Sequence, residues 1–231
     1  MKPTALITGA NRGIGFEIAR QLAGRGLHVV LGCRVEAKGE QAAARIAKEG
    51  GAVSVLKIDV SESASIEAAA KTLARTTARL DVLVNNAGIY PDKGVSVLTV
   101  SREQVITALQ TNTVGLLIVT QAFLPFLKAA APARVINVSS GYGQLSDLAP
   151  DVPSYCLSKL ALNGVTIMLA KALEAERIAV NSMCPGWVRT DMGGPQAPGT
   201  PQESARGALA LATLPFATTG RFWKDGGEIA W

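Results

Sequence analysis

The sequence alternates short, β-rich apolar runs with longer segments of helical pattern along its whole length. Strands are predicted at residues 4–8, 27–31, 53–58, 82–85, 134–139 and 178–184, with a last short strand near 221–223. Helices are predicted at residues 13–25, 36–48, 61–78, 101–127, 154–176 and 202–214. Strands separated by helices at this spacing run parallel and are joined by right-handed crossovers. The pattern therefore predicts an α/β fold, a single domain over residues 1–231 with a doubly wound parallel sheet of about seven strands flanked by helices.

Two helix starts carry capping patterns. Ser61 is predicted to cap the third helix, because its hydroxyl can accept from the first free backbone amides. The fourth helix opens with Ser101-Arg-Glu-Gln104, which is the pattern of a capping box.

The distribution of charge and the few cysteine and histidine residues argue against a nucleic-acid-binding protein and a metalloprotein. The formal net charge is +5, but the Lys and Arg residues are scattered, so no nucleic-acid partner is predicted. The three cysteines, Cys33, Cys156 and Cys184, are widely spaced and odd in number, which argues against a disulfide framework and a zinc site. The only histidine, His28, begins an apolar run and is interpreted as structural, so no catalytic metal is predicted.

The apolar stretches favour neither a membrane span nor a signal peptide. The longest stretch, residues 115–130, is interrupted by polar residues and by Pro125. A strand begins near Thr4, where a signal peptide would otherwise lie. A cytoplasmic location with no membrane partner is therefore expected.

The first predicted strand runs into the segment TGANRGIG, which places glycines at positions 9, 13 and 15. Glycine permits a tight turn and close backbone approach to a phosphate, and the following helix aims its N-terminal amides at the same place. Such a turn is typical of Rossmann-type dinucleotide binding, although a strand-to-helix turn that simply needs glycine has the same pattern. The candidate residues are Gly9, Asn11, Arg12, Gly13, Ile14 and Gly15.

The end of the second strand indicates which dinucleotide binds. An NAD site usually carries an acid there for the ribose 2′-hydroxyl, but here the strand is followed by Arg34, with no acid before Glu36. A guanidinium suits a 2′-phosphate, and Arg12 can supply a second contact. Two solvated arginines are the simpler explanation of either residue alone. Together with the missing acid they predict NADPH in preference to NADH.

Tyr155 and Lys159 stand four positions apart near the start of a helix, so their side chains share one face. A nearby ammonium favours the phenolate and lowers a tyrosine pKa from about 10, which lets the phenol donate a proton near neutral pH. The pair alone occurs often by chance. Its neighbours add to it: Ser139 and Ser140 end the fifth strand, and Asn112 lies within a helix, where exposure or a core hydrogen bond is the simpler explanation.

In their order along the chain, these segments resemble the classical short-chain dehydrogenases/reductases over essentially the whole sequence. The matching motifs are residues 8–15, Asp59-Val60, residues 85–88, Asn112, Ser140, Tyr155 with Lys159, and Pro185-Gly186 followed by Val188 and Thr190. Residues 219–226 resemble the carbonyl-reductase-like branch of the family. Each motif is common alone, and the ordered set is specific.

The resemblance implies four catalytic residues. Tyr155 would be the acid and base, and Lys159 would lower its pKa and hold the nicotinamide ribose. Ser140 would bind the substrate carbonyl, and it is preferred to Ser139 because the family usually uses the second serine of the pair. Asn112 would hold a water that links Lys159 to solvent.

The resemblance also implies the cofactor contacts. Gly9, Arg12 and Ile14 would line the diphosphate and adenosine side. Asp59 would bind the adenine amino group with Val60 beside it. The other implied contacts are Asn11, Gly13, Gly15, Arg34, Asn86 on the ribose, Ala87, Gly88, and Pro185, Gly186, Val188 and Thr190 around the carboxamide.

The expected reaction is reversible hydride transfer, in which NADPH reduces a small-molecule ketone or aldehyde to an alcohol. The alternative is a non-catalytic NADPH-binding redox sensor, although such members often lose the tyrosine or lysine that this chain keeps. Residues 90–97, 141–154 and 191–201 are expected to form a rather open pocket for hydrophobic carbonyls. The segment before Tyr155 lacks the long insertion of monomeric carbonyl reductases, so a homo-oligomer, dimer or tetramer, is expected to pair through the Tyr155 helix.

Overall fold

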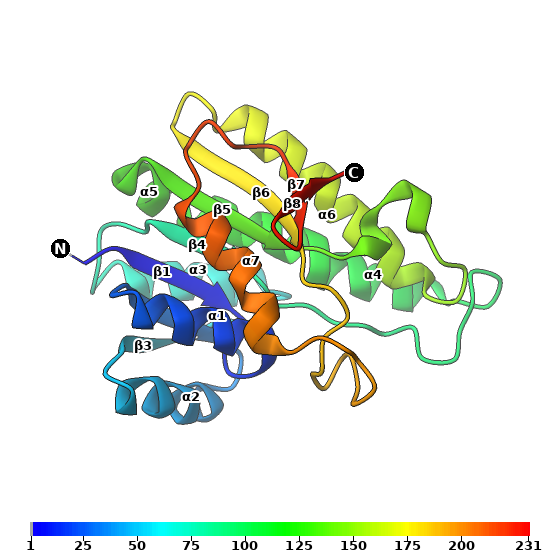
Figure 1. Ribbon diagram of the computed structural model, residues 1–231, viewed down its shortest axis with the longest axis horizontal. Helices are drawn as coiled ribbons and strands as arrows, with labels where there is room; N and C mark the ends of the chain where they lie inside the picture. The colour runs from blue at the N-terminus through cyan, green and yellow to red at the C-terminus, as the bar shows by residue number, and fades with distance from the viewer. Residues whose placement is uncertain (1) are drawn as a thin grey trace.

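All strands of the described residues lie in one sheet, which confirms the predicted doubly wound architecture (Figure 1). The computed structural model describes residues 2–231. The strand order across the sheet is β3-β2-β1-β4-β5-β6-β7-β8. The strand bounds are β1 Thr4–Thr8, β2 His28–Cys33, β3 Ala52–Lys57, β4 Val82–Asn85, β5 Ala133–Val138, β6 Ile178–Cys184, β7 Phe222–Lys224 and β8 Gly227–Ile229.

Helices connect the parallel strands. Their bounds are α1 Gly13–Gly24, α2 Glu36–Lys48, α3 Ser63–Leu73, α4 Arg102–Leu109, α5 Gly115–Ala130, α6 Pro153–Ala172 and α7 Pro201–Thr213. A π-helical turn, η1 Gln110–Val114, joins α4 to α5, and two short 3-10 turns, η2 Gly141–Gly143 and η3 Leu145–Asp147, precede α6. The capping box predicted at Ser101 is confirmed, because the Ser101 hydroxyl accepts from the Gln104 amide and the Gln104 side chain accepts from the Ser101 amide.

The last strand predicted near residues 221–223 is confirmed as β7, and the short β8 pairs with it in an antiparallel hairpin, so the sheet has eight strands where about seven were predicted. The hairpin closes through Asp225 and Gly226, which both adopt positive φ, as a tight turn requires. The predicted helix cap at Ser61 is wrong. Ser61 does not cap α3, since its hydroxyl donates to Asp59 Oδ1 at 2.6 Å and Glu62 occupies the cap position.

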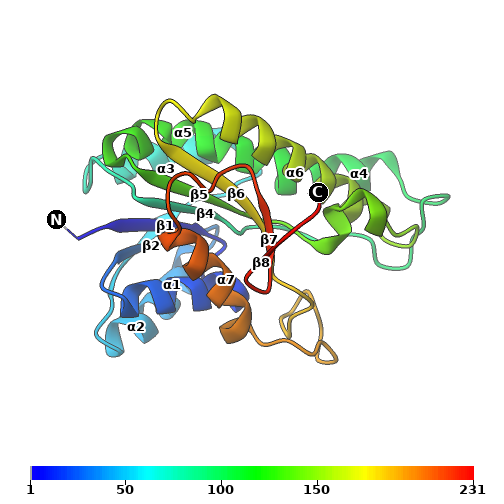
Figure 2. The same ribbon diagram turned by 45° about the horizontal axis from the view of Figure 1, so that its top comes forward.

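The helices form two layers, one on each face of the sheet (Figure 2). α1, α2 and α7 cover one face, where Ile7 and Leu31 pack against Ile18 and Leu209. α3, α5 and α6 cover the other, where Leu6 packs in the cluster that contains Phe123. Successive strand residues point to opposite faces of the sheet, and helices cover both faces, so every residue of β1 is buried. Full burial of each large apolar side chain contributes about 1.5–3 kcal/mol, so these two layers are the main source of stability.

The run Arg102–Ala130 is long and apolar enough to cross a membrane by length and composition. In the fold its α5 portion packs on the sheet, with Leu116, Val119, Phe123 and Leu127 buried. The apolar character of this helix is thus accounted for by the core.

The strand order reverses between β1 and β4, and this reversal positions the site. β1 pairs in parallel with both β2 and β4. The chain after β1 first forms β2 and β3 on one side of β1, and then forms β4 and the later strands on the other side. Loops that leave two such neighbouring strands diverge, and the crevice between them at the carboxyl edge binds ligands in this kind of sheet.

Candidate active site

A cavity of about 520 Å³ opens at the carboxyl ends of β1, β2, β4 and β5. The predicted site residues that line it are Gly9, Asn11, Arg12, Gly13, Ile14, Gly15, Arg34, Asp59, Val60, Asn86, Ala87, Gly88, Tyr155, Lys159, Pro185 and Thr190. Four others, Asn112, Ser140, Gly186 and Val188, lie outside this lining within residues 2–231. Segments far apart in the sequence therefore meet at the place that the strand ends predict.

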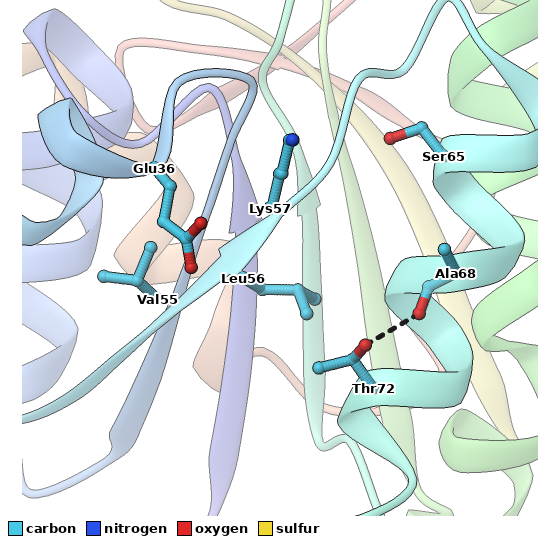
Figure 3. Close-up of a pocket in the computed structure, with 7 residues that line it drawn as sticks. All are labelled: Glu36, Val55, Leu56, Lys57, Ser65, Ala68 and Thr72. Atoms are coloured by element: carbon cyan, nitrogen blue, oxygen red, sulfur yellow. Dashed lines mark hydrogen bonds between the residues drawn. The ribbon is translucent and has the colours of Figure 1, made fainter.

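A second hollow of about 470 Å³ lies beside the edge strand β3, between α2 and α3 (Figure 3). Glu36 and Lys57 supply its charged groups, and the Thr72 hydroxyl donates to the Ala68 carbonyl within α3. None of the predicted site residues lines it in the described chain. The first acid after β2, Glu36, therefore faces this hollow and not the main cavity.

The glycine turn is held by contacts that leave no room for side chains. Gly9 and Gly13 adopt φ of +66° and +57°, which glycine tolerates best. A Cβ at Gly15 would collide with the Asn86 side chain and the Gly9 carbonyl. Among the described residues, no side chain caps α1 at Arg12, and no acid stands in its first turn, so the amide end of α1 faces the cavity. The turn therefore fits the pyrophosphate of a dinucleotide.

Asn86 has a structural function in addition to the predicted contact with the cofactor ribose. Its Nδ2 donates to the Thr8 carbonyl at 2.9 Å and to the Gly9 carbonyl at 3.3 Å. The backbone amides of Asn86 and Ala87 both donate to Thr8 Oγ1 at 3.0 Å. The amide nitrogen of Asn86 thus braces the glycine turn against β4.

Both predicted arginines line the cavity, Arg34 just after β2 and Arg12 just before α1. Arg34 is 77% exposed, and its Nε lies 3.9 Å from Asp59 Oδ2. Arg12 pairs with Asp191, on the loop that follows β6, and both side chains are exposed. Exposed ion pairs are worth at most about 1 kcal/mol, so neither pair prevents an anionic ligand from taking the arginine. The arrangement fits a 2′-phosphate.

Burial dominates the electrostatics of Tyr155 and Lys159. The Lys159 Nζ donates to the Val138 carbonyl at 2.8 Å and lies 5.6 Å from the centre of the Tyr155 ring. Burial lowers the pKa of Lys159 to about 8. Burial also raises the pKa of Tyr155 above its usual value, while a side-chain hydrogen bond with Ser140 acts in the opposite direction. The pKa of Tyr155 is thus raised where a lowering by Lys159 was predicted, because loss of solvation is the largest influence on the phenol.

The two serines after β5 differ in their contacts. Ser140 acts to lower the pKa of Tyr155, against the effect of burial, and its Oγ accepts from the Tyr142 amide at 3.2 Å. Ser139 lines the cavity, and its buried Oγ has no hydrogen-bond partner among residues 2–231. The influence of Ser140 on the Tyr155 pKa favours Ser140 as the predicted residue, although Ser139 is the one that lines the cavity.

Asn112 is fully buried at the π-helical turn η1. Its Oδ1 accepts from the Ile89 amide at 2.8 Å, and its Nδ2 donates to the Ile89 carbonyl at 2.9 Å and to Ser158 Oγ at 3.0 Å. These contacts tie the segment after β4 to α6. They account for the buried amide as a core hydrogen-bonding group, and the water relay stays a prediction.

The loop after β6 brings only part of its predicted set to the cavity. Pro185 and Thr190 line it, with Thr190 Cγ2 close to where a Cβ on Gly13 would lie. Gly186 adopts φ of +77°, which sets the turn, and Val188 is buried and bridges to Gly199. Val188 is therefore a support for the loop.

Sequence reasoning missed an aromatic cluster and a buried acid. The chain has three tyrosines, and Tyr90 and Tyr142 have ring centres 5.0 Å and 6.5 Å from that of Tyr155. Asp92, which is 3% exposed, bonds the first turn of α6. The only hint was at Val152-Pro153, where a helix starts without a capping side chain.

A glycine turn after β1 and a Tyr/Lys pair in the same cavity define the class: a dinucleotide-binding enzyme of Rossmann type. The family follows from sequence. The model of the short chain dehydrogenase family matches residues 3–200, so the chain belongs to that family of oxidoreductases.

Known relatives agree with this assignment along nearly the whole chain. A short-chain dehydrogenase, anuI, of Penicillium roqueforti is 35% identical, covering 92% of this chain and 89% of its own. Carbonyl reductase [NADPH] 1 of Rattus norvegicus is 32% identical over 95% of this chain and 94% of its own. The solved NADPH-bound carbonyl reductase from chicken fatty liver superimposes with a TM-score of 0.90 at 32% identity and covers 100% of both chains.

Proposed function

We propose that this protein is an NADPH-dependent carbonyl reductase that converts a ketone or aldehyde to an alcohol. The observation that carries the proposal is the cavity itself, in which the glycine turn after β1 lies together with a half-buried Tyr155 and a buried Lys159. The relatives named carbonyl reductase [NADPH] 1 and the NADPH-bound chicken enzyme support the cofactor and the substrate class. When bound, the cofactor supplies a hydride to the carbonyl carbon.

The residues that would hold the cofactor divide along the cavity. The amides of the glycine turn and of α1 would take the pyrophosphate. Arg34 and Arg12 would take the 2′-phosphate, with Asp59 and Val60 at the adenine. At the other end Lys159 would hold the nicotinamide ribose, and Pro185 and Thr190 would orient the carboxamide, with Gly186 and Val188 shaping that loop.

Three side chains would act on the substrate oxygen and its proton. Ser140 and Tyr155 would hydrogen-bond the carbonyl oxygen, and Tyr155 would donate its proton to that oxygen as the carbon gains hydride. The high pKa of Tyr155 keeps the phenol protonated at neutral pH, as a proton donor must be. Lys159 would return a proton to Tyr155 from solvent through a water held near Asn112.

A hydrophobic carbonyl compound is the proposed substrate class. Three exposed apolar or aromatic side chains lie beside the site: Tyr90 and Tyr142, whose ring centres are 5.0 Å and 6.5 Å from that of Tyr155, and Met192, which lines the cavity. Apolar surface at a site mouth favours apolar ligands, because both lose contact with water on binding.

We also propose a cytoplasmic homo-oligomer. Ile106 and Val114, on the α4–η1 run, and Leu157 and Met168, on α6, are exposed large apolar side chains. α4 packs against α6, so a second copy could cover these side chains together.

The competing function is a non-catalytic NADPH-binding redox sensor, and turnover distinguishes the two. Oxidation of NADPH and NADH is followed with a panel of aldehydes, ketones and diketones, with Tyr155→Phe as the control. The proposal expects Tyr155-dependent oxidation that prefers NADPH. Tight NADPH binding with no turnover across the panel would favour the sensor.

A further inference from the structure

Asp92 is a buried carboxylate on the segment after β4, and it bonds a helix start 62 positions further along the chain. Its Oδ1 accepts from the Ser154 amide at 3.1 Å and also from the Ser154 hydroxyl. Its Oδ2 accepts from the Tyr155 amide at 2.7 Å. The carboxylate thus contacts the backbone of the proposed acid itself.

α6 depends on this carboxylate because it has no cap of its own. The cap position is occupied by Val152, whose side chain has no acceptor, and the first helical residue is Pro153, which has no N–H. The first two backbone donors of α6 are therefore those of Ser154 and Tyr155, and Asp92 accepts from both. A negative charge is also favoured at a helix N-terminus.

The segment that carries Asp92 is anchored at its other end by Asn112. Asn112 bonds both the amide and the carbonyl of Ile89. Between these anchors lies Tyr90, whose ring is tilted by 60° against Tyr155 with the centres 5.0 Å apart. The first turn of α6 and one wall around the phenol are therefore held by the same short segment.

We propose that Asp92 is a positioning residue for Tyr155, which holds the first turn of α6 so that the phenol meets Ser140 and the substrate carbonyl. This inference rests on the proposed function, since it acts through the proposed acid. Asp92 is not part of the cavity lining within residues 2–231, so its effect passes through Tyr155. A misplacement of a reacting group by about 1 Å can lower a rate about 100-fold.

Asp92→Asn tests the inference with little change of volume. The amide keeps one acceptor and turns the other into a donor, so either the Ser154 or the Tyr155 amide loses its partner. We expect kcat to fall about 10- to 100-fold, with the Kd for NADPH within about twofold of wild type. Ser101→Ala is the matched control, because it removes the cap of α4 at an exposed position away from the cavity. That variant should lose stability and keep kcat within about twofold.

A double-mutant cycle separates positioning from general loss of structure. If Asp92 acts through Tyr155, Asp92→Asn should have almost no further effect on the residual activity of Tyr155→Phe. A further drop as large as that in the wild-type background, or a wild-type kcat in Asp92→Asn, would overturn the inference. Asp92→Ser retains a hydroxyl acceptor and serves if the Asn variant does not fold. Its kcat should then lie between those of wild type and Tyr155→Phe, and a wild-type kcat would count against the role.

Amide hydrogen exchange keeps this test distinct from a failure of the proposed function. The Ser154 and Tyr155 amides should lose protection in the Asp92 variants and keep it in Ser101→Ala, whether or not any carbonyl is reduced. If the Asp92 variants lose protection at these amides but the wild-type protein reduces no carbonyl, the proposed reductase function is refuted, while the capping of α6 by Asp92 is supported. Unchanged protection with an active wild type would refute the positioning role alone.

Discussion

Replacing Arg34 by Ala should weaken NADPH binding selectively, because this side chain lines the cavity just after β2, at the position where an NAD site usually has an acid. Its partner in the structure is Asp59, with Nε and Oδ2 3.9 Å apart, which is too long for a strong hydrogen bond. The Arg34 guanidinium therefore gives up only a weak interaction with Asp59 when it binds a 2′-phosphate. NADH has no such phosphate, so its binding should be unchanged.

The magnitude follows from the exposure of Arg34. A hydrogen bond to a charged group contributes about 1.5–3 kcal/mol, and at a side chain that is 77% exposed solvent screening places the value at the lower end. A loss of about 1.4 kcal/mol corresponds to about a tenfold rise in Kd. Arg34→Asp should shift the preference further toward NADH, because it adds repulsion against the phosphate and an acceptor for a ribose hydroxyl.

The assay is a titration of each variant with NADPH and NADH at two salt concentrations. Wild-type affinity for NADPH should fall with salt more steeply than that of Arg34→Ala. Arg25→Ala, an exposed arginine just after α1, is the control and should bind both cofactors as wild type does. Equal losses for NADPH and NADH in Arg34→Ala would refute the assignment of Arg34 to the 2′-phosphate.

Three further predictions concern the turn, the acid and the lysine. Gly15→Ala should destabilise the protein by about 1–3 kcal/mol in urea unfolding and weaken NADPH binding, since its Cβ meets the Gly9 carbonyl, whereas Gly24→Ala, with open space around it, should be neutral or stabilising. Alcohol oxidation needs the Tyr155 phenolate, so the raised pKa of Tyr155 predicts an oxidation rate that still increases with pH in the alkaline range. The rate of carbonyl reduction, which needs the protonated phenol, should stay constant through neutral pH. An oxidation rate that reaches its plateau near neutral pH would contradict the raised pKa. Lys159→Met should abolish turnover yet stabilise the fold at neutral pH by up to about 3 kcal/mol, because the pKa of Lys159 falls from 10.5 to about 8 on folding. For the same reason, the free energy of unfolding of the wild type should rise as the pH increases from about 8 to 10.5. A free energy of unfolding that stays constant over this range would refute the cost of burying Lys159.

Local patterns predicted the parts of the fold that depend on local physics. The strands β1, β4 and β6 and the helix α2 have the predicted bounds, since apolar runs and helical periodicity act over a few residues. The glycine turn was predictable for the same reason: its conformation needs glycine wherever it lies. The Ser61 cap failed because Asp59, two residues away, offered the hydroxyl a carboxylate acceptor.

Contacts between distant segments were not predictable from one sequence. Asp92 and Tyr90 meet Tyr155 only after β4 and β5 pair and α6 packs, and no local pattern joins positions that far apart. The pKa of Tyr155 was predicted in the wrong direction for a related reason. Spacing along a helix shows that a lysine is near, but the degree of burial is set by the whole fold.

The most direct test of the proposed reaction measures NADPH affinity and carbonyl turnover side by side in wild type and Tyr155→Phe. The proposal predicts an NADPH Kd that is nearly unchanged in the variant, with turnover reduced about 10²- to 10⁴-fold, because the phenol supplies the proton and the cofactor is held chiefly elsewhere in the cavity. Turnover in Tyr155→Phe close to that of wild type would contradict the assignment of Tyr155 as the acid.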